Sequence, residues 1–321
     1  MYPKVSIIFT SYNHREYLKK ALDSLLIQTF TDFELIIIDD CSTDGSQEVL
    51  CQYKTDARVK LYLLEKNTGS YVHSSNFGAS MAIADYIIFA QCDDFAESNQ
   101  LERLYTSMTT NPSAGVAFSS STMIDKDGKN LGNDFKYREK LFKNNCSSDI
   151  LIESKKMRRF LLSSCVIPNL SAALIKRSLF NKQGGFNRDY LVLADWDFWL
   201  KTALETNFYY IREPLNNFRQ HSSTIRATIN IKRQIGEIFK MYYDFFKLSK
   251  INIFDRIRWE FNVMMIWYGY FRSAKVFWIK SIFPLLMLSV KYSFLYPLMF
   301  AQNLFIYPCF AITRKIINYK N

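Results

Sequence analysis

The chain has 321 residues, 49% of them hydrophobic, with only 10 glycines and 7 prolines, which excludes a disordered or fibrous protein and leaves room for one large globular domain with an appendage. The formal net charge of +11 lies entirely within residues 223–321, which carry 15 Lys and Arg against 4 Asp and Glu, whereas residues 1–222 are balanced. A neutral body with a basic, aromatic tail suggests a catalytic domain joined to a segment that meets an anionic surface.

The first third of the chain alternates between short apolar runs and segments of helical periodicity. Strands are expected at residues 5–10, 34–38, 59–64 and 86–89, and the intervening helices include residues 46–53 and 74–83. Such alternation is typical of parallel strands joined by crossover helices. The sequence therefore predicts a doubly wound, mostly parallel α/β sheet.

The next part of the chain continues the pattern with more interruptions. It predicts a helix at 99–109, a strand at 115–119, a hairpin turn at Asp127-Gly128, a loop-rich excursion over 136–159, a strand at 170–175, a helix at 195–204 and an extended segment at 211–218. The neutral domain is expected to end at residue 222.

Two of the predicted strands end in paired aspartates, Asp39-Asp40 and Asp93-Asp94. Adjacent carboxylates at the end of a buried strand repel each other unless a cation or a hydrogen-bonding ligand joins them. Ligands of open α/β sheets bind outside the carboxyl ends of the strands. We therefore expect these carboxylates to face one crevice that binds a metal ion. Turn formation is the alternative, and it accounts for Ser42 and Asp44 but less well for Asp40.

Several motifs then carry a resemblance. Residues 5–13, 28–45 and 67–69, the pair Asp93-Asp94 and residues 195–197 together resemble a family 2 glycosyltransferase of the GT-A fold, particularly its bacterial spore-coat members. The resemblance covers about residues 3–222. It implies a GT-A catalytic domain at 1–222, followed by a helical extension at 223–321.

The resemblance also implies roles for individual residues. Thr10 and Tyr12 would bind the nucleotide, with Tyr12 stacking on the base, and Asp40 would contact the uracil edge. Asp93 would lie near the donor ribose. Asp94 would hold the divalent cation, Mn²⁺ or Mg²⁺, that bridges the diphosphate of a donor expected to be a UDP-sugar. Boundary packing remains the alternative for Tyr12.

Two further roles come from later in the chain. The position of Asp195 matches that of the catalytic base, although a helix cap would also explain an aspartate there. Residues 219–221 resemble the segment that closes over the diphosphate, so His221 is expected to contact metal or phosphate, with a solvated side chain as the alternative. The family often has an aspartate where this chain has Gln91.

The chemistry of sugar transfer requires residues of these types. A cation neutralises the negative charge that grows on a leaving diphosphate, and a carboxylate takes the proton of the attacking hydroxyl. A retaining hydrolase would instead need two facing carboxylates. We expect an inverting glycosyltransferase of the hexosyltransferase type, which transfers sugar to a lipid-linked or polysaccharide acceptor in cell-surface glycan synthesis. An inactive relative that only binds a nucleotide or a membrane is the alternative.

The basic tail is expected to meet the membrane. Residues 292–312 contain no charged side chain over 21 positions, which reaches the length of a transmembrane helix, but Pro297 and Pro308 interrupt the run. Helices lying in the interface are therefore predicted, with packing on the catalytic domain or a homodimer interface as alternatives. The six cysteines show no CxxC pair, and no leader precedes the first strand, so we expect a cytoplasmic protein at the inner membrane face. Nucleic acid binding is not expected.

Overall fold

The computed structural model describes residues 2–133, 142, 148–221, 231–249 and 256. The chain divides into two compact units, Met1–Thr228 and Ile229–Asn321, and the second is described through helix α10 (Ile231–Ser249) and residue 256. The predicted interfacial segment at 292–312 lies outside the described residues. Among the helices that are described, none combines the length and the apolar character needed to cross a membrane.

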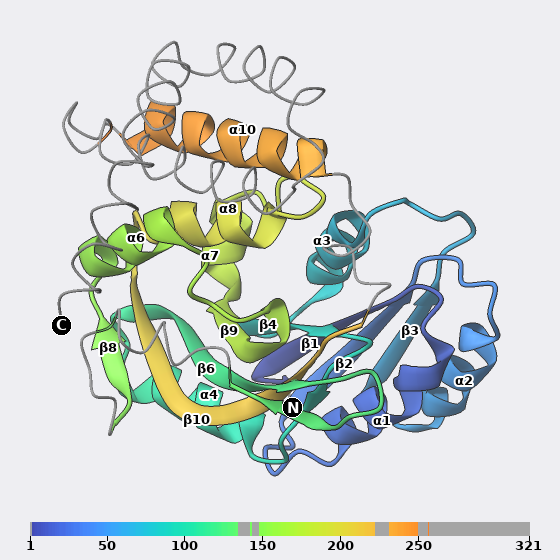
Figure 1. The fold of residues 1–321 in the computed structure, drawn as a ribbon. Helices are drawn as coiled ribbons and strands as arrows, with labels where there is room; N and C mark the ends of the chain where they lie inside the picture. Colours follow the sequence, from blue (N-terminus) through green and yellow to red (C-terminus); the bar gives the residue numbers. More distant parts are fainter. Residues whose placement is uncertain (1, 134–141, 143–147, 222–230, 250–255, 257–321) are drawn as a thin grey trace, which may run out of the picture. The chain divides into compact units, whose positions relative to one another are not determined.

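The first unit is built on a mostly parallel sheet, as predicted. Its strand order is β3-β2-β1-β4-β9-β6-β10-β5, and the first four of these strands are parallel: β1 Val5–Ser11, β2 Phe33–Asp39, β3 Val59–Leu63 and β4 Tyr86–Gln91. The chain winds outward from β1 to β3 and then returns to place β4 on the other side of β1 (Figure 1). This reversal of strand order leaves a crevice beyond the carboxyl ends of β1 and β4, where ligands of such sheets bind.

The other half of the sheet is mixed. Strand β9 (Ala173–Lys176) runs antiparallel to both β4 and β6 (Ala114–Ile124), whereas the long strand β10 (Asn207–Arg219) is parallel to β6. Short strands complete it: β5 Phe95–Ala96, β7 Asn130–Gly132 and β8 Ile150–Ile152. The predicted hairpin turn at Asp127-Gly128 joins β6 to β7 and is confirmed.

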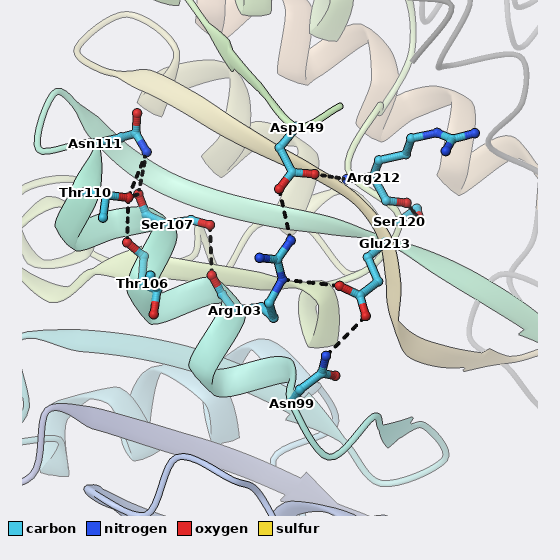
Figure 2. A network of polar contacts seen from close by, with 10 residues as sticks. All are labelled: Asn99, Arg103, Thr106, Ser107, Thr110, Asn111, Ser120, Asp149, Arg212 and Glu213. Atoms are coloured by element: carbon cyan, nitrogen blue, oxygen red, sulfur yellow. Dashed lines mark hydrogen bonds and ion pairs between the residues drawn. The ribbon is translucent and has the colours of Figure 1, made fainter. Parts of the chain in front are cut away.

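A bend in β10 directs its last residues toward the end of β4. The pairing of β10 with β6 is irregular between Ile211 and Asn216, after which Asn216 pairs with Ala96 in β5. Figure 2 shows the contacts beside this bend: Arg103 donates from Nε to Glu213 Oε2 at 3.2 Å and from Nη2 to Asp149 Oδ2 at 3.1 Å. These contacts fasten the bend to helix α4 (Gln100–Thr110).

Helices cover both faces of the parallel half, as Figure 1 shows. The side chains of α1 (Arg15–Leu26), α2 (Ser46–Gln52) and α4 form one core with Ile7 and Phe9 of β1. Helix α3 (Tyr71–Met81) covers the opposite face, where a Cβ at Gly78 would lie 2.6 Å from Ile8 Cγ2. A side chain at position 78 would therefore push α3 away from the sheet. A short 3-10 turn, Tyr53–Thr55, follows α2.

Two expectations about the later chain need correction. Most of the first half of the loop-rich excursion expected over 136–159 lies outside the described residues. Its second half is wrong, because that part forms β8 and helix α6 (Ser154–Ser163). Met157 and Leu161 give α6 a buried face, but neighbouring lysines and arginines hide its periodicity in the sequence. The strand expected at 170–175 begins only at β9, after a 3-10 turn at Leu170–Ala172. Helices α7 (Arg177–Lys182) and α8 (Ala194–Thr202) follow it.

Candidate active site

The loops that follow β1 and β2 are locked together at the carboxyl edge of the sheet. The backbone N–H of Asn13, which has a φ of 51°, donates to Ser42 Oγ at 2.9 Å, and Asn13 Oδ1 accepts the N–H of Thr43 at 2.8 Å. Asp39 accepts the N–H of Ser42 at 2.9 Å and its hydroxyl at 2.6 Å. Asp39 therefore shapes the turn after β2. The bonds between Asn13 and residues 42 and 43 hold that turn against the loop after β1.

Asp40, the next residue, joins the loop after β3 to the same edge. It is buried, and its two carboxylate oxygens accept the N–H and the hydroxyl of Thr68, both at 2.9 Å. Each of these oxygens has a further lone pair that a ligand could use. The proposed contact of Asp40 with a uracil edge stays a prediction. Thr68, which belongs to the motif at residues 67–69 but was given no role there, supports this carboxylate.

The predicted nucleotide-binding residues Thr10 and Tyr12 lie at the end of β1 and just after it. Thr10 is buried near the end of β1, in register with Ile38 of β2 and Gln91 of β4. Tyr12 lies in the following loop with 44% of its surface exposed. An aromatic ring exposed at a strand end has a free face on which a base can stack. Base stacking by Tyr12 stays a prediction.

Asp94 points into the protein and is held from three sides. Its Oδ2 accepts from Asn169 Nδ2 at 2.5 Å and from Ser171 Oγ at 2.7 Å, and its Oδ1 accepts the N–H of Arg219 at 3.0 Å. Burial and the negative charge of Asp93 raise the pKa of the Asp94 carboxyl above its ordinary value, against the effect of these hydrogen bonds. Asp94 thus joins the end of β4 to β10 and to the segment before β9.

Asp93 lies beside it and contacts His221. Asp93 Oδ2 and His221 Nε2 are 2.9 Å apart, and the His221 side chain is only 5% exposed. The carboxylate of Asp93 is more accessible, at 19%. The solvated alternative for His221 is therefore wrong, since the imidazole is buried against a carboxylate at the end of β4.

A divalent cation fits this pair of side chains. Carboxylate and imidazole are ordinary ligands of Mn²⁺, so Asp93 and His221, which lie in contact, would be able to hold such an ion together. In the described part of the chain, no group of three or more His, Cys, Asp or Glu side chains is arranged to hold a metal ion. Two protein ligands suit an ion whose remaining positions are taken by substrate phosphates and water.

His14, which the sequence analysis did not single out, is a neighbour of this pair. Its ring lies edge-on to that of His221, with centroids 5.6 Å apart, and its Nδ1 is 2.7 Å from the carbonyl oxygen of Tyr12. A groove of about 560 Å³ opens beside it between α1 and α2, lined by Asn13, Arg15 and others. His14 thus connects the groove to the Asp93–His221 pair.

Asp195, the predicted base, lies in the first turn of α8 next to Asp197. It is buried, and its Oδ1 accepts the N–H of Trp196 at 2.8 Å. Asp197 has a different role, because its carboxylate pairs with Lys201 one turn later at 2.6 Å. Asn76 of α3 holds the loop that leads toward α8 by bonding both the N–H and the carbonyl of Phe186, at 2.9 and 2.8 Å. The catalytic role of Asp195 stays a prediction.

The sequence profile described as "Glycosyl transferase family 2" matches residues 6–182, more than half of the chain. The chain therefore belongs to glycosyl transferase family 2, and the resemblance seen in its motifs is confirmed. It is an enzyme of the glycosyltransferase class.

Individual proteins show the same likeness. TuaG of Bacillus subtilis, named as a putative teichuronic acid biosynthesis glycosyltransferase, is 36% identical over 130 residues, which cover 40% of this chain and 51% of TuaG. The alignment thus spans about half the length of that relative. The structure of TarS 1–349 from Staphylococcus aureus in complex with UDP-GlcNAc superposes with a TM-score of 0.64 at 18% identity, covering 82% of this chain and 71% of TarS.

A more distant structure has the same fold. The mannosyltransferase PcManGT from Pyrobaculum calidifontis, in complex with GDP-Man and Mn²⁺, superposes with a TM-score of 0.53 at 16% identity, covering 76% of this chain and 64% of that one. The curled, mostly parallel sheet is thus the GT-A fold that the motifs predicted.

Proposed function

We propose that the protein is an inverting glycosyltransferase that moves a sugar from a nucleotide donor, most simply a UDP-sugar, to a glycan acceptor. The observation that carries this proposal is the Asp93–His221 pair, which lies at the end of β4 beside the interlocked loops of Tyr12 and Asp40. The UDP-GlcNAc bound by TarS and the GDP-Man and Mn²⁺ bound by PcManGT support a nucleotide-sugar donor and a divalent cation.

The cation has two candidate ligands at the end of β4. The resemblance assigns Asp94, but both of its oxygens already accept hydrogen bonds from protein groups in the interior. We assign the cation to Asp93 and His221, because these two side chains of ligand type lie in contact and Asp93 is the more accessible carboxylate. Asp94 then holds the strand end in place. When bound, the cation would neutralise charge on the leaving diphosphate.

The remaining chemistry falls to the chain's own residues. Tyr12 would stack on the base, with Thr10 and Asp40 fixing the nucleotide. The acceptor oxygen attacks the anomeric carbon from the face opposite the diphosphate, and its proton passes to the Asp195 carboxylate. The new carbon–oxygen bond forms as the bond to the nucleoside diphosphate breaks, and the electron pair leaves with the diphosphate. The anomeric configuration inverts.

The acceptor is proposed to be a cell-surface glycan, either lipid-linked or a growing polysaccharide. The name of TuaG refers to teichuronic acid synthesis, which is consistent with such an acceptor. The basic residues of 223–321 would hold the enzyme at an anionic membrane surface on the cytoplasmic side, with a homodimer contact as the alternative use of that segment.

The test is turnover of nucleotide sugars by purified full-length protein with Mn²⁺, read as release of the free nucleoside diphosphate. We expect one UDP-sugar to be turned over above all other donors, and chelation of the metal to stop the reaction. Binding of UDP without turnover of any donor would favour the inactive relative. Absence of both binding and turnover would contradict the proposed function.

A further inference from the structure

Arg219, the last residue of β10, has a guanidinium that bonds to main-chain carbonyls on two separate segments. Its Nε donates to the carbonyl of Asp93 at 2.8 Å, and its Nη1 donates to the carbonyls of Asp125 and Lys126 at 3.0 and 2.8 Å. Only 4% of the residue is exposed. A buried guanidinium in this arrangement fixes the main chain of the end of β4 against that of the β6–β7 turn.

The same residue makes two further contacts. Its own N–H donates to Asp94 Oδ1 at 3.0 Å, and its guanidinium carbon lies 4.5 Å from the ring centre of Tyr17 on α1. The guanidinium is thus stacked on an aromatic ring and hydrogen-bonded to main-chain carbonyls. Among the described residues, no carboxylate forms an ion pair with it. Its position is therefore determined by three other segments of the fold: the end of β4, the β6–β7 turn and α1.

Arg219 also stands two residues before His221 in the chain. Its side chain holds the carbonyl of Asp93, and the following backbone brings the His221 imidazole to the Asp93 carboxylate. Both side chains that we assign to the cation are thus placed by the same arginine. The guanidinium of Arg219 thus fixes the backbone on one side of the Asp93–His221 contact, and its main chain leads directly into the other side.

We propose that Arg219 is a positioning residue that holds Asp93 and His221 next to each other, so that both can bind the cation. This proposal rests on the proposed function, because it concerns the same site. It predicts that loss of the arginine weakens cation binding more than it weakens the fold, since an outer-shell partner of a metal ligand contributes to affinity by orienting that ligand.

The experiment compares Arg219→Lys and Arg219→Gln with Arg103→Gln in the full-length protein. Arg103 is a matched control, because it also fastens β10, through Glu213, but lies in the separate network of Figure 2. Mn²⁺ affinity is measured by electron paramagnetic resonance in the presence of UDP, together with thermal stability and the Mn²⁺ dependence of turnover.

We expect both Arg219 variants to bind Mn²⁺ about 10- to 100-fold more weakly than the unchanged protein, with turnover partly restored by a matching excess of Mn²⁺. Lysine keeps the charge but cannot reach three carbonyls with one ammonium group. Arg103→Gln should lower thermal stability and leave Mn²⁺ affinity unchanged.

Three results would overturn the positioning role: unchanged Mn²⁺ affinity in the Arg219 variants, an equal loss in Arg103→Gln, or failure of both Arg219 variants to fold, which would make the residue purely structural. If the unchanged protein does not bind Mn²⁺ in the presence of UDP, the proposed function itself is contradicted. That result is obtained without any variant, so it can be told apart from a failure of the role proposed for Arg219.

Discussion

His221 Nε2 lies 2.9 Å from Asp93 Oδ2, although 128 positions separate the two residues in the chain. The contact joins the end of β4 to the segment after β10, and it is possible because β10 bends at residues 211–216 before it reaches β5. The carboxyl edge of the parallel strands is thereby completed by a residue from the far end of the domain.

The two aspartates at the end of β4 are expected to respond differently to amide substitution. Asp93→Asn should remove cation-dependent turnover and leave the melting temperature nearly unchanged. Asp94→Asn should destabilise the fold by about 2–3 kcal/mol, because an amide cannot accept hydrogen bonds at both of its ends from Asn169, Ser171 and the N–H of Arg219. Denaturant unfolding and Mn²⁺-dependent turnover of both variants provide the measurement. The reverse pattern would return the cation to Asp94.

Asp195→Asn should leave UDP affinity intact and lower turnover about 10²- to 10⁴-fold, because the variant removes a proton acceptor and keeps the shape of the side chain. Asp197→Asn is the control from the same helical turn. It breaks the pair with Lys201 and should reduce stability more than turnover. Calorimetric titration with UDP and steady-state kinetics of both variants provide the measurement. Loss of UDP binding in Asp195→Asn would instead make Asp195 part of the donor site.

Glu34, which lies outside the candidate active site, is expected to make the stability of the fold depend on pH. Burial would raise the pKa of its carboxyl, but hydrogen bonds from the N–H of Ile83, from Lys60 and from Ser6 outweigh that effect and lower the pKa from its ordinary value of 4.5. A carboxyl with a lowered folded-state pKa stabilises the fold above about pH 4.5, and this contribution is lost as the pH falls through the folded-state value.

Glu34→Gln should therefore lower the free energy of unfolding by about 1–3 kcal/mol at pH 7, and the difference from the unchanged protein should shrink as the pH falls toward 3. Asp127→Asn is the control, because its side chain is 71% exposed and its pair with Lys126 lies at the surface. Urea unfolding at a series of pH values gives the measurement. A difference that stays constant with pH would show that the carboxylate charge of Glu34 does not contribute.

The parallel half of the fold could be predicted from the sequence because local signals agree there. Apolar runs such as residues 35–38 are followed by turn residues and then by helical periodicity, so strand type and order follow from neighbouring residues. Helix α6 could not be predicted, since its buried face is only two or three residues wide among basic side chains. The antiparallel direction of β9 also has no local signal, because it depends on pairing with β4 and β6.

The candidate site, too, could be predicted from the sequence only in part. Paired aspartates at strand ends are visible in the sequence, and they correctly mark the carboxyl edge of β2 and β4. Which aspartate of a pair turns inward depends on donors such as Asn169 and Arg219, which come from distant segments. The packing of His14 against His221 likewise depends on the bend of β10.

The basic extension provides a separate prediction. Because residues 223–321 carry the whole net charge, removal of this segment should abolish flotation of the protein with vesicles that contain anionic lipid. The full-length protein with neutral vesicles is the control. Flotation of the shortened protein at an unchanged level would contradict the membrane role and leave the homodimer contact as the explanation to examine, by sedimentation of both proteins.

The most direct test of the cation site is the affinity of the protein for Mn²⁺ with and without UDP, measured by electron paramagnetic resonance for the unchanged protein and for Asp93→Asn. If Asp93 and His221 hold an ion that also contacts the donor diphosphate, UDP should tighten Mn²⁺ binding to the unchanged protein, and Asp93→Asn should bind Mn²⁺ at least about 10-fold more weakly. Equal Mn²⁺ affinity in the two proteins, with no effect of UDP on either, would contradict the account.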